Sequence, residues 1–214
     1  MKVVRQALVA AGALAVAAGL VRVGRRSGVD CHEARGPLPG DDVVPRPEWQ
    51  STRGITIGAP AADVWPWIVQ MGYPAVRAGW YTPYWLDRLQ WGIAQRSADH
   101  IVPALQQLSV GDTVPDSPDG STFFTVVTVD PARALVLHST RHLMRPFTRL
   151  SFSWAFVLSP RGNGGTRLLM RARVTADPCW ARPVFWLLIG PGDFLNASVM
   201  LCGIRRRVEG AARA

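Results

Sequence analysis

The sequence has few of the residues on which disulfide and metal frameworks depend. Its three cysteines, Cys31, Cys179 and Cys202, form an odd and scattered set. Such a set gives no disulfide framework and fits a reducing compartment or simple burial. Cys31 and His32 are adjacent, but no second pair of ligands stands near them at zinc spacing. We therefore predict neither a metal site nor a cofactor.

The signature motifs of several large enzyme classes are also absent. The sequence contains no GxSxG, no GxxxxGK[ST] and no HExxH, so nothing in it points to the sites that those motifs build. Gly162 to Gly165 lacks the lysine and the helix of a phosphate loop, and we interpret it as a hairpin turn. His138 and His100 are the only candidates for acid or base catalysis, and each is better interpreted as a structural or surface histidine. A protein that is not an enzyme is favoured, although the question stays open.

The basic residues do not form a nucleic-acid footprint. The net charge is +9, but five of the 24 basic residues lie within residues 1–26, and the remaining 19 face 15 acidic residues. A nucleic-acid site needs a concentrated basic stripe. Arg205 to Arg207 is instead interpreted as the end of a helix, where positive charge complements the helix dipole. No nucleic-acid partner is predicted.

The N-terminal segment has the pattern of a membrane-directed helix. Residues 7–21 are an uninterrupted apolar run flanked by basic residues on both sides. Because a full span takes about 20 apolar residues, the run needs neighbouring valines and snorkelling arginines to cross a bilayer. We interpret residues 1–26 as a single-pass anchor in the cell membrane, with a cleaved signal peptide and a loosely ordered tail as alternatives. The balance of flanking charge favours a cytoplasmic domain by a narrow margin.

The rest of the chain is long enough for one domain behind a linker. Residues 27–50 carry four prolines and no periodicity, which indicates a linker that lies on the domain surface. Residues 51–212 hold the domain pattern, so a chain that begins near Arg35 is expected to fold.

A strand and an amphipathic helix open that pattern. Ile55 and Ile57 alternate with small or polar residues, as in a strand with one buried face. Pro60 then starts a helix in which apolar residues recur at i, i+3, i+4 and i+7. These residues are Val64, Trp67, Ile68 and Met71. Pro66 requires either that the helix begins near Asp63 or that it is kinked.

Most of the remaining chain predicts antiparallel sheet followed by one helix. Strands are expected over 122–129, 134–139, 151–158 and 167–174. The last strand alternates apolar residues with Arg167, Arg171 and Arg173, which is typical of a sheet that is packed on one side and wet on the other. From Phe194 onward a helical spacing of apolar residues predicts a long C-terminal helix.

The ordered set of local motifs resembles a known superfamily between about residues 38 and 209. In chain order the motifs are AP-x-x-x-VW-x-W, GWY-x-x-x-WLD, SAD-x-IVP, VGD, VDP-x-RALVL, WAFVL-x-P and GDF followed by GIRRR. This set is similar to bacterial members of the START-like, polyketide-cyclase-like SRPBCC superfamily. The resemblance implies an α+β helix-grip fold, in which a curved antiparallel sheet wraps around a long C-terminal helix. It implies no single activity.

The resemblance also places a cavity between the concave sheet face and the C-terminal helix. We expect it to hold a hydrophobic small molecule, lipid or polyketide-like, for binding or transfer. A cyclase or dehydrase type of enzyme and a structural domain with a filled core are the alternatives. The aromatic segment 79–91 either plugs one end of the sheet or lines the ligand entrance. The candidate ligand-binding residues are Trp67, Trp80, Tyr81, Tyr84, Trp85, Phe124, Trp154, Phe156, Met170, Phe194, Leu201 and Ile204.

Overall fold

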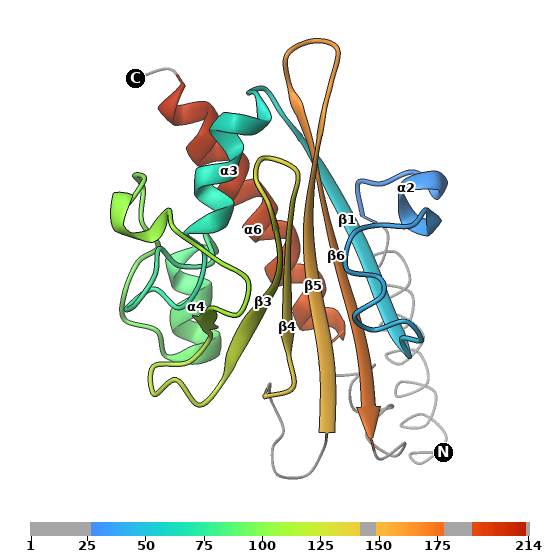
Figure 1. The fold of residues 1–214 in the computed structure, drawn as a ribbon. Coiled ribbons are helices and arrows are strands. Elements are labelled where there is room, and N and C mark those ends of the chain that lie inside the picture. The colour runs from blue at the N-terminus through green and yellow to red at the C-terminus, as the bar shows by residue number, and fades with distance from the viewer. Residues whose placement is uncertain (1–26, 142–148, 178–189, 213–214) are drawn as a thin grey trace, which may run out of the picture.

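The computed structural model describes residues 27–141, 149–177 and 190–212, which form an α+β fold (Figure 1). Six strands of the described part make one antiparallel sheet in the order β1-β6-β5-β4-β3-β2. The strands are β1 (Trp49–Ile57), β2 (Thr113–Pro115), β3 (Phe123–Asp130), β4 (Ala134–Ser139), β5 (Arg149–Pro160) and β6 (Thr166–Asp177). The helices are α2 (Cys31–Arg35), α3 (Ala61–Val69), α4 (Tyr84–Trp91), the short 3-10 helix η1 (Pro103–Leu105) and α6 (Gly190–Ala211). The predicted α+β class is confirmed.

The longest strands, β5 and β6, form a hairpin that sets the two faces of the sheet. Trp154 lies opposite Ala172, and Phe156 lies opposite Met170. Since side chains alternate between faces with a period of two, the even-numbered residues of both strands point to one face. Phe156 and Met170 are fully buried there, which confirms the alternation predicted for this hairpin.

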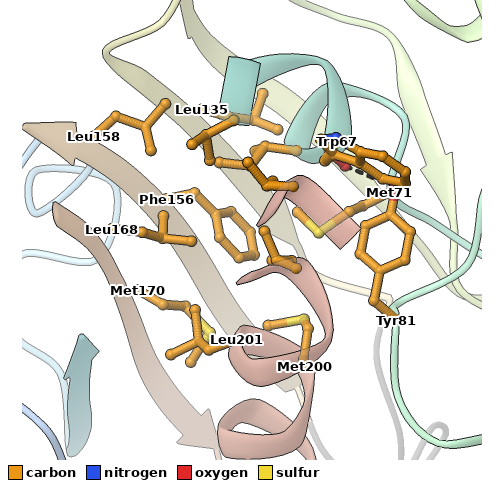
Figure 2. Packing of buried hydrophobic residues seen from close by; sticks show 14 of the residues in the cluster. Trp67, Met71, Tyr81, Leu135, Phe156, Leu158, Leu168, Met170, Met200 and Leu201 are labelled. Carbon is orange, nitrogen blue, oxygen red and sulfur yellow. Dashed lines mark hydrogen bonds between the residues drawn. The ribbon is translucent and has the colours of Figure 1, made fainter. Parts of the chain in front are cut away.

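Helix α6 lies across this concave face and covers it (Figure 1). It packs against β1 and α3. The helix contributes buried apolar residues to the main core, which it shares with the strands (Figure 2). They are Ala197, Met200, Leu201, Ile204 and Val208. A curved antiparallel sheet that holds a long C-terminal helix is consistent with the helix-grip fold.

Helix α3 runs through its internal proline. Its N-cap is Pro60, and Pro66 lies inside the helix, so the helix begins before Asp63. The predicted apolar stripe is confirmed, because Val64, Trp67, Ile68 and Met71 are all buried in the main core.

The convex face of the sheet is not wet, contrary to the sequence-based expectation. Arg171 is only 2% exposed, because residues 28–45 fold back over this face. Its guanidinium donates to Asp41 Oδ2 at 2.7 Å and to the Gly36 carbonyl at 2.8 Å. Burial lowers the pKa of Arg171, and Asp41 opposes this shift. The alternation identified the two faces correctly, but a polar face can be covered when each buried charge gains a partner.

The same segment is held at a second point of β6. Arg167 binds Glu33 through two nitrogen atoms, Nε at 2.8 Å and Nη2 at 2.7 Å. This bidentate contact lowers the pKa of Glu33. Asp30 caps α2 in a capping box with Glu33, so the short helix is fixed at both its start and its acidic side chain. Residues 28–45 therefore lie against the convex face and hold defined contacts with β6.

The predicted membrane anchor and cell-membrane location need correction. No helix in residues 27–141, 149–177 and 190–212 is long and apolar enough to span a bilayer. Even α6, with 22 residues, is interrupted by Asp193, Arg205 to Arg207 and Glu209, whereas a span needs about 20 mainly apolar residues. The apolar run 7–21 on which the prediction depended lies outside the described residues.

Candidate functional site

The concave face carries a continuous cluster of five aromatic side chains, which we call the aromatic cluster. Its members are Trp80, Phe124, Phe152, Trp154 and Phe156. Trp154 is central, with its ring centroid 5.2 Å from Trp80, 5.8 Å from Phe124 and 5.2 Å from Phe156. Phe152 stacks on Trp154 at 5.9 Å and meets Phe124 edge-on at 5.4 Å. Offset and edge-to-face contacts of this kind each add about 0.5–1.5 kcal/mol beyond area burial.

Burial changes across the aromatic cluster. Phe156 and Phe124 are 0% and 1% exposed and belong to the main core. Trp80, Phe152 and Trp154 are only half-buried. The cluster thus runs from the sealed core to a part of the concave face that the described protein leaves partly uncovered.

A titratable carboxyl lies beside the half-buried edge of the aromatic cluster. Asp116 follows β2 directly, and its backbone N–H donates to the Thr122 carbonyl at 2.9 Å. Desolvation raises the pKa of Asp116 to about 7, and a hydrogen bond from Trp80 opposes this shift. Asp116 can therefore hold or release a proton near neutral pH at the rim of the aromatic cluster.

A buried polar network fixes the loop that delivers Trp80. Tyr81 is 1% exposed; its hydroxyl donates to the Trp67 carbonyl and accepts from Gln70 Nε2, both at 2.9 Å. Gln70 also accepts from the Val102 N–H at 2.9 Å. Burial is the main cause that raises the pKa of Tyr81 above its usual range. Tyr81 has a positive φ of 61°, a conformation that residues other than glycine rarely adopt, and the network holds it there.

Beyond the main core the concave face continues into a second cluster of buried residues. It consists of Trp49, Leu150, Ala172, Val174 and Ala176, and Phe152 and Trp154 pack against it. Polar residues of β1 share this face, because Ser51 pairs with Ala172 and Arg53 with Met170. Arg53 is 1% exposed and donates to Ser51 Oγ at 3.1 Å. This part of the concave face is therefore more polar than the main core.

The structure sorts eleven of the twelve predicted ligand-binding residues into three groups. Trp80, Phe124, Trp154 and Phe156 form most of the aromatic cluster. Trp67, Tyr81, Met170, Leu201 and Ile204 are packed in the main core (Figure 2). Tyr84 and Trp85 lie on α4, where Arg96 covers the Tyr84 ring at 4.6 Å and Trp85 is 62% exposed. Phe194 belongs to α6, but its side chain is outside the described residues. Ligand contact by these residues remains a prediction.

Neither candidate histidine reaches the aromatic cluster. His138 pairs with Ser153 across the β4–β5 ladder and points to the convex face, where its Nε2 lies 2.8 Å from Ser151 Oγ. Burial lowers the pKa of His138. His100 lies on an exposed loop beside Asp99 at 3.1 Å. Among the described residues, no group of three or more His, Cys, Asp or Glu side chains could hold a metal ion.

Sequence reasoning missed five notable residues of the concave side. The alternation along the strand put Phe152 on the correct face, but Phe152 was not named as a ligand-binding residue. Trp49, Ser51 and Arg53 could have been found by extending the alternation of Ile55 and Ile57 backwards along β1. Asp116 had no usable signal, because it stands in a turn-rich stretch, and only the tertiary fold brings it beside Trp80.

Comparison with known proteins adds a fold-level likeness. No family model and no curated protein matches the chain. Protein NE0264 from Nitrosomonas europaea is 14% identical, with a TM-score of 0.47, and the alignment covers 82% of this chain and 99% of that one. Protein MLL2253 from Mesorhizobium loti is 16% identical over 76% of this chain and 98% of that one, with a TM-score of 0.45. CalU16 from Micromonospora echinospora is 15% identical over 77% and 86%, with a TM-score of 0.36. At such low similarity these likenesses carry no argument about function.

Proposed function

We propose that the protein binds or transfers a hydrophobic small molecule, lipid or polyketide-like, between the concave sheet face and α6. The observation that carries the proposal is the half-burial of Trp80, Phe152 and Trp154 at the edge of an otherwise sealed core. Large aromatic side chains that remain partly uncovered beside a core favour the binding of an apolar partner. An enclosed apolar ligand would gain about 25 cal/mol for each Å² that it buries.

We also propose membership of the START-like SRPBCC superfamily. The ordered sequence motifs and the helix-grip arrangement support this assignment together. The resemblance to that superfamily implies a ligand site under α6, but it implies no particular chemistry. The ligand class therefore depends on the residues of the concave side.

A second candidate function is a cyclase or dehydrase type of enzyme, and Asp116 is the observation that favours it. A general acid or base works best when its pKa is close to the working pH. The pKa of Asp116 is raised to about 7, and the residue adjoins Trp80. Asp116, rather than His138 or His100, would then act on a bound ligand.

Two measurements test the binding proposal. Native mass spectrometry of the protein purified from its own host should show a copurified hydrophobic molecule. Titration with pyrene, which absorbs tryptophan emission, should show saturable energy transfer. Trp154→Ala should weaken pyrene binding about tenfold, equal to about 1.4 kcal/mol, because Trp154 contacts four other rings of the aromatic cluster.

Trp85→Ala is the matched control, since Trp85 is exposed on α4 and its loss should leave pyrene affinity unchanged. A protein that carries no copurified molecule and shows no saturable pyrene binding would instead be a structural domain with a filled core.

A further inference from the structure

Three buried hydrogen-bond donors on the concave side have no partner in the described structure. They are Nε1 of Trp49, Nε1 of Trp154 and Oγ of Ser198. Trp49 is 4% exposed and belongs to the second cluster, and Trp154 packs against that cluster. An indole N–H can only donate. Leaving a buried donor unpaired costs its lost hydration, so buried polar groups of native proteins are nearly always satisfied.

The sheet register places the two indoles on the same face. Trp154 pairs with Ala172, and Trp49 pairs with Val174, the residue two positions further along β6. Ala172 is fully buried and has only a methyl side chain. The two tryptophans therefore flank a stretch of β6 at which the sheet presents little side-chain volume.

Helix α6 brings Ser198 to about the same level. Met170 of β6 and Leu201 of α6 belong to the same core and point toward one another in Figure 2. Helix α6 crosses the concave face obliquely, in a direction roughly opposite to that of β6 (Figure 1). Ser198 precedes Leu201 by about 4.5 Å of helix, and Ala172 follows Met170 by about 6.6 Å of strand. Ser198 thus lies near the level of Ala172 and of its strand partner Trp154.

We infer that the concave side selects an apolar molecule that carries oxygen acceptors, such as carbonyl or carboxylate groups. Nε1 of Trp154, Oγ of Ser198 and Nε1 of Trp49 donate to these oxygens, and the aromatic cluster packs against the apolar part. This inference rests on the proposed binding function and specifies its ligand class. A plain hydrocarbon would leave the donors unpaired, and such a site discriminates against molecules that lack the matching polar group.

The test compares benzophenone with diphenylmethane by calorimetric titration of the full chain. The two probes share a carbon skeleton and differ in one C=O in place of a CH₂. The wild-type protein should bind benzophenone about two- to tenfold more tightly, as expected for one net hydrogen bond. Trp154→Phe and Ser198→Ala each remove one donor and should each move this ratio toward one, whatever their effect on the affinity for diphenylmethane. Trp49→Phe is a third variant of the same kind.

Trp85→Phe is the control and should leave the ratio unchanged, because Trp85 is exposed on α4. Irradiation of bound benzophenone should label peptides from β1, β5, β6 or α6. If wild-type protein binds both probes equally, or if the ratio persists in all three variants, the acceptor preference is wrong while the binding function stands. Labels confined to other elements would overturn the assignment of the site. If neither probe binds, the proposed function fails and the inference fails with it.

Discussion

Replacing Arg171 tests whether residues 28–45 are an integral part of the domain. The guanidinium of Arg171 is almost fully buried and donates to Thr52 Oγ1, to Asp41 and to the carbonyls of Glu33, Ala34 and Gly36. Arg171→Ala removes all of these donors at once. It leaves the Asp41 carboxylate, which is only 23% exposed, paired with Arg173 alone instead of with two arginines.

The expected loss in free energy of unfolding is about 3–5 kcal/mol. Removing one partner of a buried ion pair costs roughly this amount. The partial exposure of Asp41 and its remaining contact with Arg173 favour the lower end. Because whole domains are stable by only about 5–15 kcal/mol, the variant should unfold at a much lower urea concentration. Urea denaturation followed by circular dichroism measures the change.

Arg161→Ala is the matched control for this experiment. Arg161 also pairs with residues 28–45, through Glu33 at 3.5 Å, but its side chain is 50% exposed. Exposed pairs contribute about 0–1 kcal/mol. If Arg171→Ala costs no more than Arg161→Ala, the contacts on the convex face do not contribute to stability and the reasoning is refuted.

Three further predictions concern α6, Asp116 and the start of the chain. Gly203→Ala places a methyl group against the Tyr81 carbonyl and should destabilise the fold by at least about 2 kcal/mol in urea denaturation. Gly210→Ala is the control, because its methyl group meets no atom within 4 Å. Equal effects of the two variants would contradict the close approach of α6 to Tyr81. The pKa of Asp116 is raised above its unfolded value of 3.8 to about 7, so the folded state holds its proton longer and the free energy of unfolding should fall as pH rises from about 4 to 7. Asp116→Asn should flatten this pH dependence, and an unchanged slope would show that other groups cause it. A chain that begins at residue 36 should still fold, but its free energy of unfolding should be lower by about 1–3 kcal/mol. The reason is that it lacks Glu33 and the carbonyls that Arg167 and Arg171 bind. A free energy of unfolding equal to that of the full chain would show that α2 is dispensable.

Local patterns in the sequence determined most of the elements and their faces. The spacing of apolar residues in α3 and α6 and the alternation along β5 and β6 require only neighbouring residues, because helix and strand periods are properties of the local backbone. The ordered motifs then indicated how these elements assemble. Four of the five members of the aromatic cluster were named as site residues for the same reason, since they stand on predicted inward positions or in the aromatic segment 79–91.

Only the tertiary structure decided what covers each face. The alternation showed that Arg171 points away from the core, but Asp41, 130 residues away in sequence, determines that this face is buried. The register of β1 against β6 places Trp49 and Arg53 on the concave face. The register of β4 against β5 places His138 on the opposite face. The position of Asp116 beside Trp80 depends on the packing of two loops. Burial, pKa and the pairing of donors are set by contacts between distant parts of the chain, and periodicity contains no information about these contacts.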